Sequence, residues 1–390
     1  MPLLFLMFVL TIDSFSGIFV GSHVEEGDVN LRIPGPTPCP DVVLEAMSKQ
    51  MINHRGKEFG ELIDRATDRL KKFFQTKEDV FILTASGTGA MEAAIVNTLS
   101  PGDKVLAVTV GVFGDRFARI AEVYGANVTR LSFKWGTAAD PEEIRKALQK
   151  DPGIKAVIVT HNETSTGVTN DLKSIAAVVR EFDKLLLVDA ISSIGSIDLP
   201  VDKWQCDVVV TGSQKGWMVP PGLAMISFNQ KAWQANAEAK MPRVYWDLAA
   251  AKRYLERDQT PWTPAVSIFY ALDVAFRLME DEGLPNIVAR HERIGKAARD
   301  GVKSLGLSLF PDEKYASNTV TAVTSPDGMD TKKLLEILRQ EKKVVLSGGQ
   351  QQLEGMIFRI GHLGHVSEDD IAQVIEALRE VLPRVGFKIA

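Results

Sequence analysis

Two patterns of hydrophobic and polar positions alternate along residues 79–226, one typical of buried strands and one typical of amphipathic helices. Short apolar runs rich in β-branched residues predict buried strands at Val80–Thr84, Lys104–Val110, Ala126–Phe133, Ile154–Thr160, Leu185–Asp189 and Asp207–Thr211. Helical periodicity between them predicts helices at Thr88–Leu99, Asp115–Tyr124, Pro141–Lys150 and Asp171–Asp183. Leu223–Phe228 could add one more strand. Nearly continuous apolar strands that alternate with amphipathic helices predict an α/β domain with a mainly parallel sheet covered on both faces.

The pattern changes after Ala265. Helical stretches come first, and short strands and two more helices follow: Ser267–Glu282, Leu284–Leu305, strands Leu307–Phe310 and Thr319–Thr324, helix Thr331–Gln340, strands Val344–Leu346 and Met356–Ile360, and helix Glu368–Val381. This order predicts a smaller C-terminal α+β domain. We therefore expect a large domain at residues 29–265 and a small one at 266–390, closely packed because no low-complexity linker separates them.

Length and composition agree with this division. A chain of 390 residues exceeds what one compact core usually holds. The 45 basic and 50 acidic residues give a net charge of −5, without a block of like charges, which argues against nucleic acid or a membrane as a partner. Two cysteines, Cys39 and Cys206, are too few for a disulfide framework or a cysteine zinc site and indicate a reducing, cytoplasmic location.

The first 28 residues stand apart from the rest of the chain. Residues 1–20 are apolar, but they lack a basic leading segment and Asp13 interrupts the run. Two interpretations remain: a dispensable or mis-started extension, or a weak membrane or targeting element. Globular patterning begins near Val29.

Polar motifs follow the predicted strands, where parallel sheets gather their ligands. Ser86-Gly87-Thr88-Gly89 lies between a predicted strand and a predicted helix, so its backbone N–H groups and hydroxyls suit a phosphate. An ordinary helix N-cap with a tight turn would have the same sequence pattern. Asp189 ends an apolar strand, where a carboxylate is costly unless it meets a cation such as a protonated pyridine nitrogen or caps a helix.

Two cationic residues complete the set. Lys215 follows the next strand inside Gly212-Ser213-Gln214-Lys215-Gly216, where small neighbours leave room for a Schiff base, although a surface loop lysine is the simpler interpretation. Arg359 interrupts an otherwise apolar strand and so requires a planar anion, either a substrate carboxylate or a structural ion-pair partner. Together, a phosphate loop, a carboxylate, a lysine and an arginine clamp are the parts that pyridoxal 5′-phosphate chemistry needs.

With these motifs in order, the chain resembles a class V (fold-type I) aminotransferase of the alanine/serine–glyoxylate, or serine–pyruvate, branch. The resemblance runs from about Leu31 to the C-terminus. Its further motifs are Ile33-Pro34-Gly35-Pro36-Thr37, Thr160-His161-Asn162-Glu163-Thr164-Ser165-Thr166-Gly167, Val188-Asp189-Ala190 and Phe358-Arg359-Ile360-Gly361.

The resemblance implies a role for each matching residue. Lys215 would form the internal aldimine with pyridoxal 5′-phosphate and shift the proton, and Asp189 would keep the ring nitrogen protonated. The remaining implied contacts are Phe113 stacked on the ring, Thr164 at O3′, Ser86, Gly87, Thr88 and Gln214 at the phosphate, Thr263 from a second subunit of a homodimer, and Arg359 with the Gly35 backbone at the substrate carboxylate.

One stretch departs from the family. Close glyoxylate aminotransferases often carry Tyr-His-His-Thr before the family proline, but this chain has Thr260-Pro261-Trp262-Thr263-Pro264. The variant is similar to broad-specificity prokaryotic members and weakens a prediction of the amino donor. His54-Arg55 also stays open, either as a pair that reaches the partner's active site or as a surface pair at a helix entry.

The favoured function is transfer of the amino group of alanine or serine to glyoxylate or pyruvate. Aspartate as donor, or a broad specificity, remains an alternative. A cysteine desulfurase would need a cysteine in the segment before the arginine strand, and Leu346–Gln352 has none. A non-catalytic cofactor-binding protein would not need both Lys215 and Arg359.

Overall fold

The computed structural model describes residues 29–389, so the extension at residues 1–28 lies outside the described residues, together with both of its interpretations. A seven-stranded sheet forms the centre of the larger part, in the order β2-β10-β9-β8-β5-β3-β4. The strands span Asp79–Ala85 (β2), Lys104–Thr109 (β3), Asn127–Ser132 (β4), Ile154–Thr160 (β5), Leu185–Asp189 (β8), Val208–Gly212 (β9) and Gly222–Phe228 (β10). The run from β9 to β4 is parallel, whereas β10 is antiparallel to both of its neighbours, β2 and β9. The predicted α/β class with a mainly parallel sheet is confirmed.

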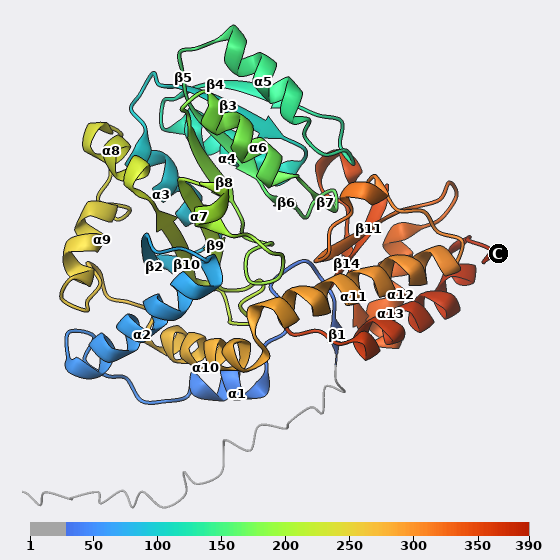
Figure 1. The fold of residues 1–390 in the computed structure, drawn as a ribbon. Helices are drawn as coiled ribbons and strands as arrows, with labels where there is room; N and C mark the ends of the chain where they lie inside the picture. The colour runs from blue at the N-terminus through green and yellow to red at the C-terminus, as the bar shows by residue number, and fades with distance from the viewer. Residues whose placement is uncertain (1–28, 390) are drawn as a thin grey trace, which may run out of the picture.

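Both faces of the sheet are covered by helices (Figure 1). Strand β8 shows why its sequence is apolar throughout. Leu186 and Val188 point into one hydrophobic cluster, and Leu185 and Leu187 point into the other, because successive side chains of a strand face opposite sides. The helices are α2 (Lys57–Phe74), α5 (Pro141–Lys150), α6 (Leu172–Glu181) and α10 (Val266–Glu282) on the first side, and α3 (Gly87–Thr98), α4 (Val112–Val123), α8 (Gln230–Glu238) and α9 (Leu248–Leu255) on the second.

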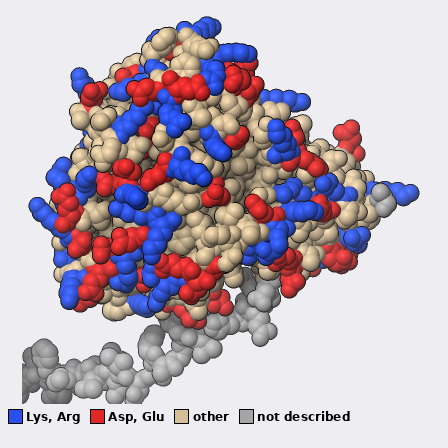
Figure 2. All heavy atoms as spheres, in the orientation of Figure 1, with Lys and Arg blue, Asp and Glu red and all other residues tan. Residues whose placement is uncertain are grey.

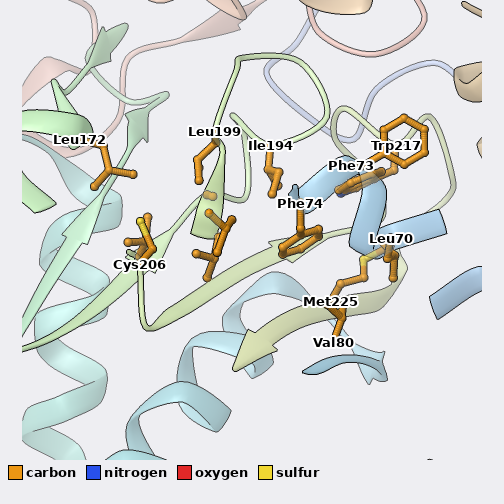
Figure 3. Packing of buried hydrophobic residues seen from close by; sticks show 14 of the residues in the cluster. Leu70, Phe73, Phe74, Val80, Leu172, Ile194, Leu199, Cys206, Trp217 and Met225 are labelled. Atoms are coloured by element: carbon orange, nitrogen blue, oxygen red, sulfur yellow. The ribbon is translucent and has the colours of Figure 1, made fainter. Parts of the chain in front are cut away.

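The first cluster includes a group of aromatic side chains from α2 and from the loop after β9. Trp217 is fully buried, stacks on Phe74 at 6.1 Å and meets Phe73 edge-on at 5.9 Å (Figure 3). Its indole nitrogen donates to Thr211 Oγ1 at 3.1 Å. Because Trp217 lies two residues beyond Lys215, this packing anchors the lysine's loop to the core.

The smaller part is built on a three-stranded antiparallel sheet in the order β11-β14-β13. Its elements are β11 (Val320–Thr324), β13 (Ser347–Gly348), β14 (Ile357–Gly361), α11 (Leu284–Ser304), α12 (Thr331–Lys342) and α13 (Glu368–Val381), drawn orange to red in Figure 1. The strand predicted at Leu307–Phe310 is wrong: Leu309 makes a single isolated bridge to Val323. Pro311 follows at once and has no N–H to extend a ladder.

The N-terminal arm joins the two parts. β1 (Asn30–Leu31) pairs in parallel with β12 (Val344–Val345), and the Arg32 side chain forms an ion pair with Asp370 at 3.2 Å. From there the chain crosses to the large sheet and enters α1 (Asp41–Ala46). Two short strands, β6 (Asn162–Glu163) and β7 (Val168–Thr169), and helix α7 (Val201–Trp204) complete the large part.

The hydrophobic cores meet along α11. Ile287 belongs to the first cluster of the large sheet, whereas Ile294, Ala298 and Val302 of the same helix belong to the core of the smaller part. α10 packs wholly in the first cluster, so packing continues past residue 265. The division into residues 29–265 and 266–390 stays a prediction.

The surface and the helices bear on possible partners. Basic and acidic side chains are interspersed over the face drawn in Figure 2. Among residues 29–389, no helix combines the length and the apolar character that crossing a membrane requires.

Candidate active site

A cavity of about 260 Å³ opens at the carboxyl ends of β2, β5, β8 and β9. The lining residues are Gly35, Pro36, Ser86, Gly87, Thr88, Phe113, Arg116, Asn162, Thr164, Asp189, Ile191, Ser192, Gln214, Lys215 and Pro221. The three polar motifs predicted to follow strands of the large sheet, at Ser86, Asp189 and Lys215, therefore contribute to one cavity, as the position of ligands in parallel sheets predicts.

The N-terminus of α3 forms one wall. Ser86 is its N-cap residue, with extended backbone angles, and its side chain makes no capping hydrogen bond. The first N–H groups of a helix have no intrahelical acceptor, and the helix dipole adds partial positive charge there. This end of α3 is therefore equipped to receive an anionic group in the cavity.

Gln214 lies on the same wall. Its buried side-chain oxygen has no hydrogen-bond partner among the described residues. A buried polar atom without a partner is costly, so this amide indicates a polar ligand.

Asp189 ends β8 and is buried. Its Oδ1 accepts from the backbone N–H of Ile191 at 2.9 Å, and its Oδ2 accepts from Thr160 Oγ1 at 3.3 Å. Burial raises the pKa of Asp189 to about 6, and the nearby Glu163 charge adds to the rise. A cation facing this carboxylate would remove most of the cost of burying it.

Lys215 extends from the loop after β9 into the cavity. Burial lowers its pKa to about 8, with Asp189 opposing the shift and Arg359 and Arg116 adding to it. The ammonium nitrogen donates to the carbonyl oxygen of Pro34. A lysine with a lowered pKa has a larger neutral fraction, and the neutral amine is the nucleophilic form.

The N-terminal arm passes directly over this lysine. Gly35 has a φ of +134°, and a Cβ at this position would lie 2.4 Å from Lys215 Nζ. Thr37 secures the crossing, since its N–H donates to Gln214 O at 3.1 Å and its hydroxyl donates to Lys215 O at 3.1 Å. Only glycine fits between the arm and the lysine.

Phe113 and Thr164 also line the cavity. Phe113 lies in the first turn of α4, and the Arg116 guanidinium stacks on its ring at 4.7 Å from the centroid. Thr164 follows β6 and is buried.

Arg359 lies in the middle of β14, buried between neutral acceptors. Its Nε donates to Gly348 O at 2.9 Å, and its Nη1 donates to Thr164 O at 3.0 Å and Gln350 Oε1 at 3.3 Å. Burial lowers its pKa to about 10, against the charge of Glu163. Among residues 29–389 it forms no ion pair within 4.0 Å, so its charge still lacks an anion in direct contact. It approaches the cavity through Thr164 and is not itself a lining residue.

Besides Arg359, three further expected residues lie outside the cavity of this single chain. Thr263 is exposed on the segment before α10. His54 is half-buried, and Arg55 binds the chain's own backbone, with Nη1 donating to Thr260 O and Nη2 to Pro261 O at 3.1 Å. Arg55 therefore holds the segment that carries Thr263.

Several lining residues escaped the sequence prediction. Pro36 and Asn162 belong to quoted motifs but had no assigned role. Ile191 and Ser192 follow Asp189, Pro221 precedes β10, and Arg116 lies one turn into α4. Their positions next to strand ends were a usable indication. What was missing was the direction of each side chain, which depends on how the loops fold.

The site fits pyridoxal 5′-phosphate on three separate observations. The α3 N-terminus lacks a side-chain cap, the buried amide of Gln214 lacks a partner, and the buried carboxylate of Asp189 has no salt bridge among the described residues. A phosphate, a polar neighbour and a protonated ring nitrogen match these needs.

Comparison with known proteins agrees with this geometry. The family model described as "Aminotransferase class-V" matches residues 29–366. The chain is 44% identical to the soluble hydrogenase 42 kDa subunit of Anabaena cylindrica, over 92% of this chain and 94% of the relative. It is 38% identical to the L-aspartate–glyoxylate aminotransferase of Paracoccus denitrificans (92% of each chain) and 37% identical to the serine–glyoxylate aminotransferase of Methylorubrum extorquens (93% of each).

A solved structure extends the likeness to three dimensions. The alanine–glyoxylate aminotransferase of Nostoc sp. superposes with a TM-score of 0.88 at 32% identity, covering 91% of this chain and 95% of that one.

Proposed function

The chain belongs to the class-V aminotransferases, and from this premise we propose that it transfers the amino group of alanine or serine to glyoxylate or pyruvate. The observation that carries the proposal is the pairing of Lys215, a partly buried amine with a lowered pKa, with Arg359, a buried guanidinium without an ion-pair partner among the described residues. The first suits carbonyl chemistry and the second suits an α-carboxylate. Glyoxylate as acceptor is supported by the names of the relatives at 32–38% identity.

Membership of the family implies pyridoxal 5′-phosphate as the cofactor. When bound, it supplies an electron sink that stabilises negative charge at the α-carbon of an amino acid. We assign the phosphate to Ser86, Gly87, Thr88 and Gln214, on the wall formed by the α3 N-terminus. Phe113 is assigned to the ring face and Thr164 to the ring's O3′ oxygen.

Lys215 acts in two ways in this proposal. Between turnovers its amine would anchor the cofactor covalently, and during a turnover the same nitrogen, released from the cofactor, would move a proton at the substrate's α-carbon. The lowered pKa of about 8 leaves an appreciable neutral fraction near neutral pH. Gly35 allows the arm to cover the lysine closely, which limits access of water to that nitrogen.

Asp189 and Arg359 orient the reactants. The Asp189 carboxylate would hold a proton on the ring nitrogen, and the cost of burying this carboxylate would fall when it faces a cation. The planar fork of Arg359 holds the α-carboxylate, with the Gly35 backbone beside Lys215 as the second contact.

We also propose a homodimer with active sites at the interface. Thr263 is exposed on its own chain, next to a surface where Tyr245 and Trp262 stack at 6.0 Å and expose 45% and 40% of their surfaces. Exposed aromatic side chains favour a protein interface. Sedimentation equilibrium tests this: a monomer that binds the cofactor at full affinity would contradict it.

Aspartate is the second candidate donor. Arg116 lines the cavity, and among residues 29–389 its guanidinium has no carboxylate partner within 4.0 Å. A second carboxylate on the substrate could bind there, and a relative at 38% identity is named for aspartate and glyoxylate. Arg116→Gln should then impair aspartate much more than alanine or serine, because only aspartate carries the second carboxylate.

The experiment that tests the function is a single turnover of the holoenzyme with each amino acid. Alanine, serine and aspartate are mixed separately with enzyme, and the change in cofactor absorbance is followed in a stopped-flow instrument. The donor with the highest rate at saturation is the preferred one, and glyoxylate and pyruvate are compared in the reverse half-reaction. Failure of all three donors to change the spectrum would overturn the proposal.

A cysteine desulfurase is not supported, since neither Cys39 nor Cys206 lines the cavity and burial raises the pKa of both thiols.

A further inference from the structure

Glu163 is a fully buried carboxylate between two residues that line the cavity, Asn162 and Thr164. Burial raises its pKa, while hydrogen bonds from its neighbours oppose the shift. Its own side chain does not line the cavity, so contact with a ligand does not explain why the chain buries this charge.

The carboxylate ties two segments together. Oε2 accepts from the backbone N–H groups of Phe113 and Gly114, both at 3.0 Å, in the first turn of α4. Oε1 accepts from the backbone N–H of Ser165 at 3.2 Å and from its hydroxyl at 2.5 Å. The Ser165 hydroxyl oxygen in turn accepts from the N–H of Val112 at 3.0 Å. Every one of these bonds joins the loop after β6 to the start of α4 or stiffens that loop.

Gly111 packs directly against Glu163 and Ser165. A Cβ on Gly111 would lie 2.4 Å from Ser165 Oγ and 2.5 Å from Glu163 Cγ. The φ of Gly111 is 171°, which any residue can adopt, so close packing rather than backbone conformation requires glycine there.

The two segments carry the side chains assigned to the cofactor ring. The backbone N–H of Phe113 donates to the Glu163 carboxylate, and Thr164 directly follows Glu163 in the chain. Thr164 O also accepts from Arg359 Nη1 at 3.0 Å, so the arginine clamp is bonded to the same loop. A change at Glu163 would therefore alter the relative positions of all three.

We propose that Glu163 is a positioning residue that fixes Phe113 and Thr164 relative to each other and so shapes the slot for the pyridine ring. The phosphate wall at the α3 N-terminus is built from other residues and should not depend on it. The inference rests on the proposed cofactor site and adds a residue that acts through its neighbours.

Glu163→Gln tests it with little change in volume. A glutamine has one acceptor oxygen and one NH₂ group. Its NH₂ group must therefore face either the N–H groups at the start of α4 or the N–H of Ser165, and the hydrogen bonds on that side are lost. The variant should bind pyridoxine 5′-phosphate, a ring ligand without the aldehyde, about tenfold or more weakly, since hydrogen bonds to a buried charge are the strong ones. Inorganic phosphate, which needs only the α3 N-terminus, should bind the apoprotein with unchanged affinity.

The matched control is Asp171→Asn, which removes a helix-capping carboxylate remote from the cavity. Asp171 accepts from Ser174 N at 3.1 Å and from Ser174 Oγ at 2.7 Å, the same pair of donors that Ser165 offers Glu163. This control should leave both ligand affinities unchanged, and asparagine still caps the helix. Gly111→Ala, which displaces the network and keeps the charge, should weaken the ring ligand selectively, as Glu163→Gln does.

The outcomes are distinct. Equal weakening of pyridoxine 5′-phosphate and phosphate in Glu163→Gln, or wild-type affinity for both, would overturn the inference. Should that variant not fold, the same two titrations on Gly111→Ala and on Ser165→Ala decide the matter. A wild-type protein that binds neither pyridoxine 5′-phosphate nor pyridoxal 5′-phosphate would instead overturn the proposed function itself.

Discussion

Arg359 Nη1 donates a 3.0 Å hydrogen bond to the carbonyl oxygen of Thr164, across 195 residues of sequence. The bond joins β14 of the smaller part to the loop after β6, whose threonine side chain lines the cavity. The arginine is thus held in place by protein carbonyl groups before a substrate arrives. Its acceptors are neutral, so a carboxylate would be the first anion in direct contact with it among the described residues.

Arg359→Lys should weaken binding of donor and acceptor acids alike. Lysine keeps the charge but loses the planar fork, and the loss of a bidentate contact costs about 2 kcal/mol or more, about 30-fold in affinity. We expect KM for the amino acid to rise while the cofactor spectrum is unchanged. Simple amines without a carboxylate should be almost indifferent to the change.

A matched control for this prediction is Arg243→Lys. The Arg243 guanidinium also donates to backbone carbonyl groups, Val96 O at 2.8 Å and Ala239 O at 3.2 Å, but it lies outside the cavity. It should affect stability only. If Arg359→Lys leaves KM untouched or merely unfolds the protein, Arg359 has a structural role and the carboxylate binds elsewhere.

Lys215 should be the covalent anchor of the cofactor. Reduction of the holoenzyme with borohydride, followed by peptide mapping, should place the pyridoxyl group on this residue and on no other lysine. Lys215→Ala should still bind pyridoxal 5′-phosphate noncovalently and lose turnover by about 100-fold or more, because a positioned proton-transfer group is removed. A label on a different lysine would contradict the assignment.

Asp189→Asn should leave a folded protein that reacts slowly. Without the carboxylate, a proton on the ring nitrogen loses its partner, so we expect the single-turnover rate to fall by more than about tenfold. Asp207→Asn is the control, because Asp207 is a buried carboxylate at the opposite end of the same strands, bonded to Leu186 N at 2.8 Å. Near wild-type rates in Asp189→Asn would show that Asp189 only caps the turn at Ile191.

His291 should make the wild-type protein more sensitive to acid than a His291→Gln variant. Burial lowers its pKa to about 3, and its Nε2 accepts from the backbone N–H of Gly364 at 3.0 Å. In the unfolded chain the ordinary pKa is about 6.5, so only the unfolded form gains this proton as the pH falls below that value. The stability that the neutral histidine contributes is thus complete above pH 6.5 and is lost on acidification towards pH 3.

The measurement compares urea unfolding of wild type and His291→Gln at pH 7.5 and pH 5.5. The free-energy difference between the two proteins should shrink by about 1 kcal/mol at the lower pH, since each pH unit in the window is worth about 1.4 kcal/mol per site. A difference that stays constant over this range would show that folding does not lower the pKa of His291.

Sequence patterns determined most of the large sheet and the chemistry of the site. Buried parallel strands reveal themselves as apolar runs such as Leu185–Asp189, because both of their faces are covered. The polar residues directly after such runs, Ser86, Asp189 and Lys215, then had to meet, since the carboxyl ends of parallel strands share one edge. The predicted strand at Leu307–Phe310 was wrong, because Leu309 forms only an isolated bridge and Pro311, which has no N–H, cannot extend the pairing.

Tertiary structure alone decided the contacts between segments that are distant in the chain. The sequence around Glu163 does not predict that its carboxylate accepts hydrogen bonds from the start of α4. The sequence likewise does not predict that Arg359 donates to the carbonyl oxygen of Thr164. Nor does the motif around Gly35 show that the arm crosses Lys215 with no room for a Cβ. Local sequence determines which residue types follow each strand. The direction of a loop side chain depends on packing against partners up to hundreds of residues away, and only the folded chain brings those partners together.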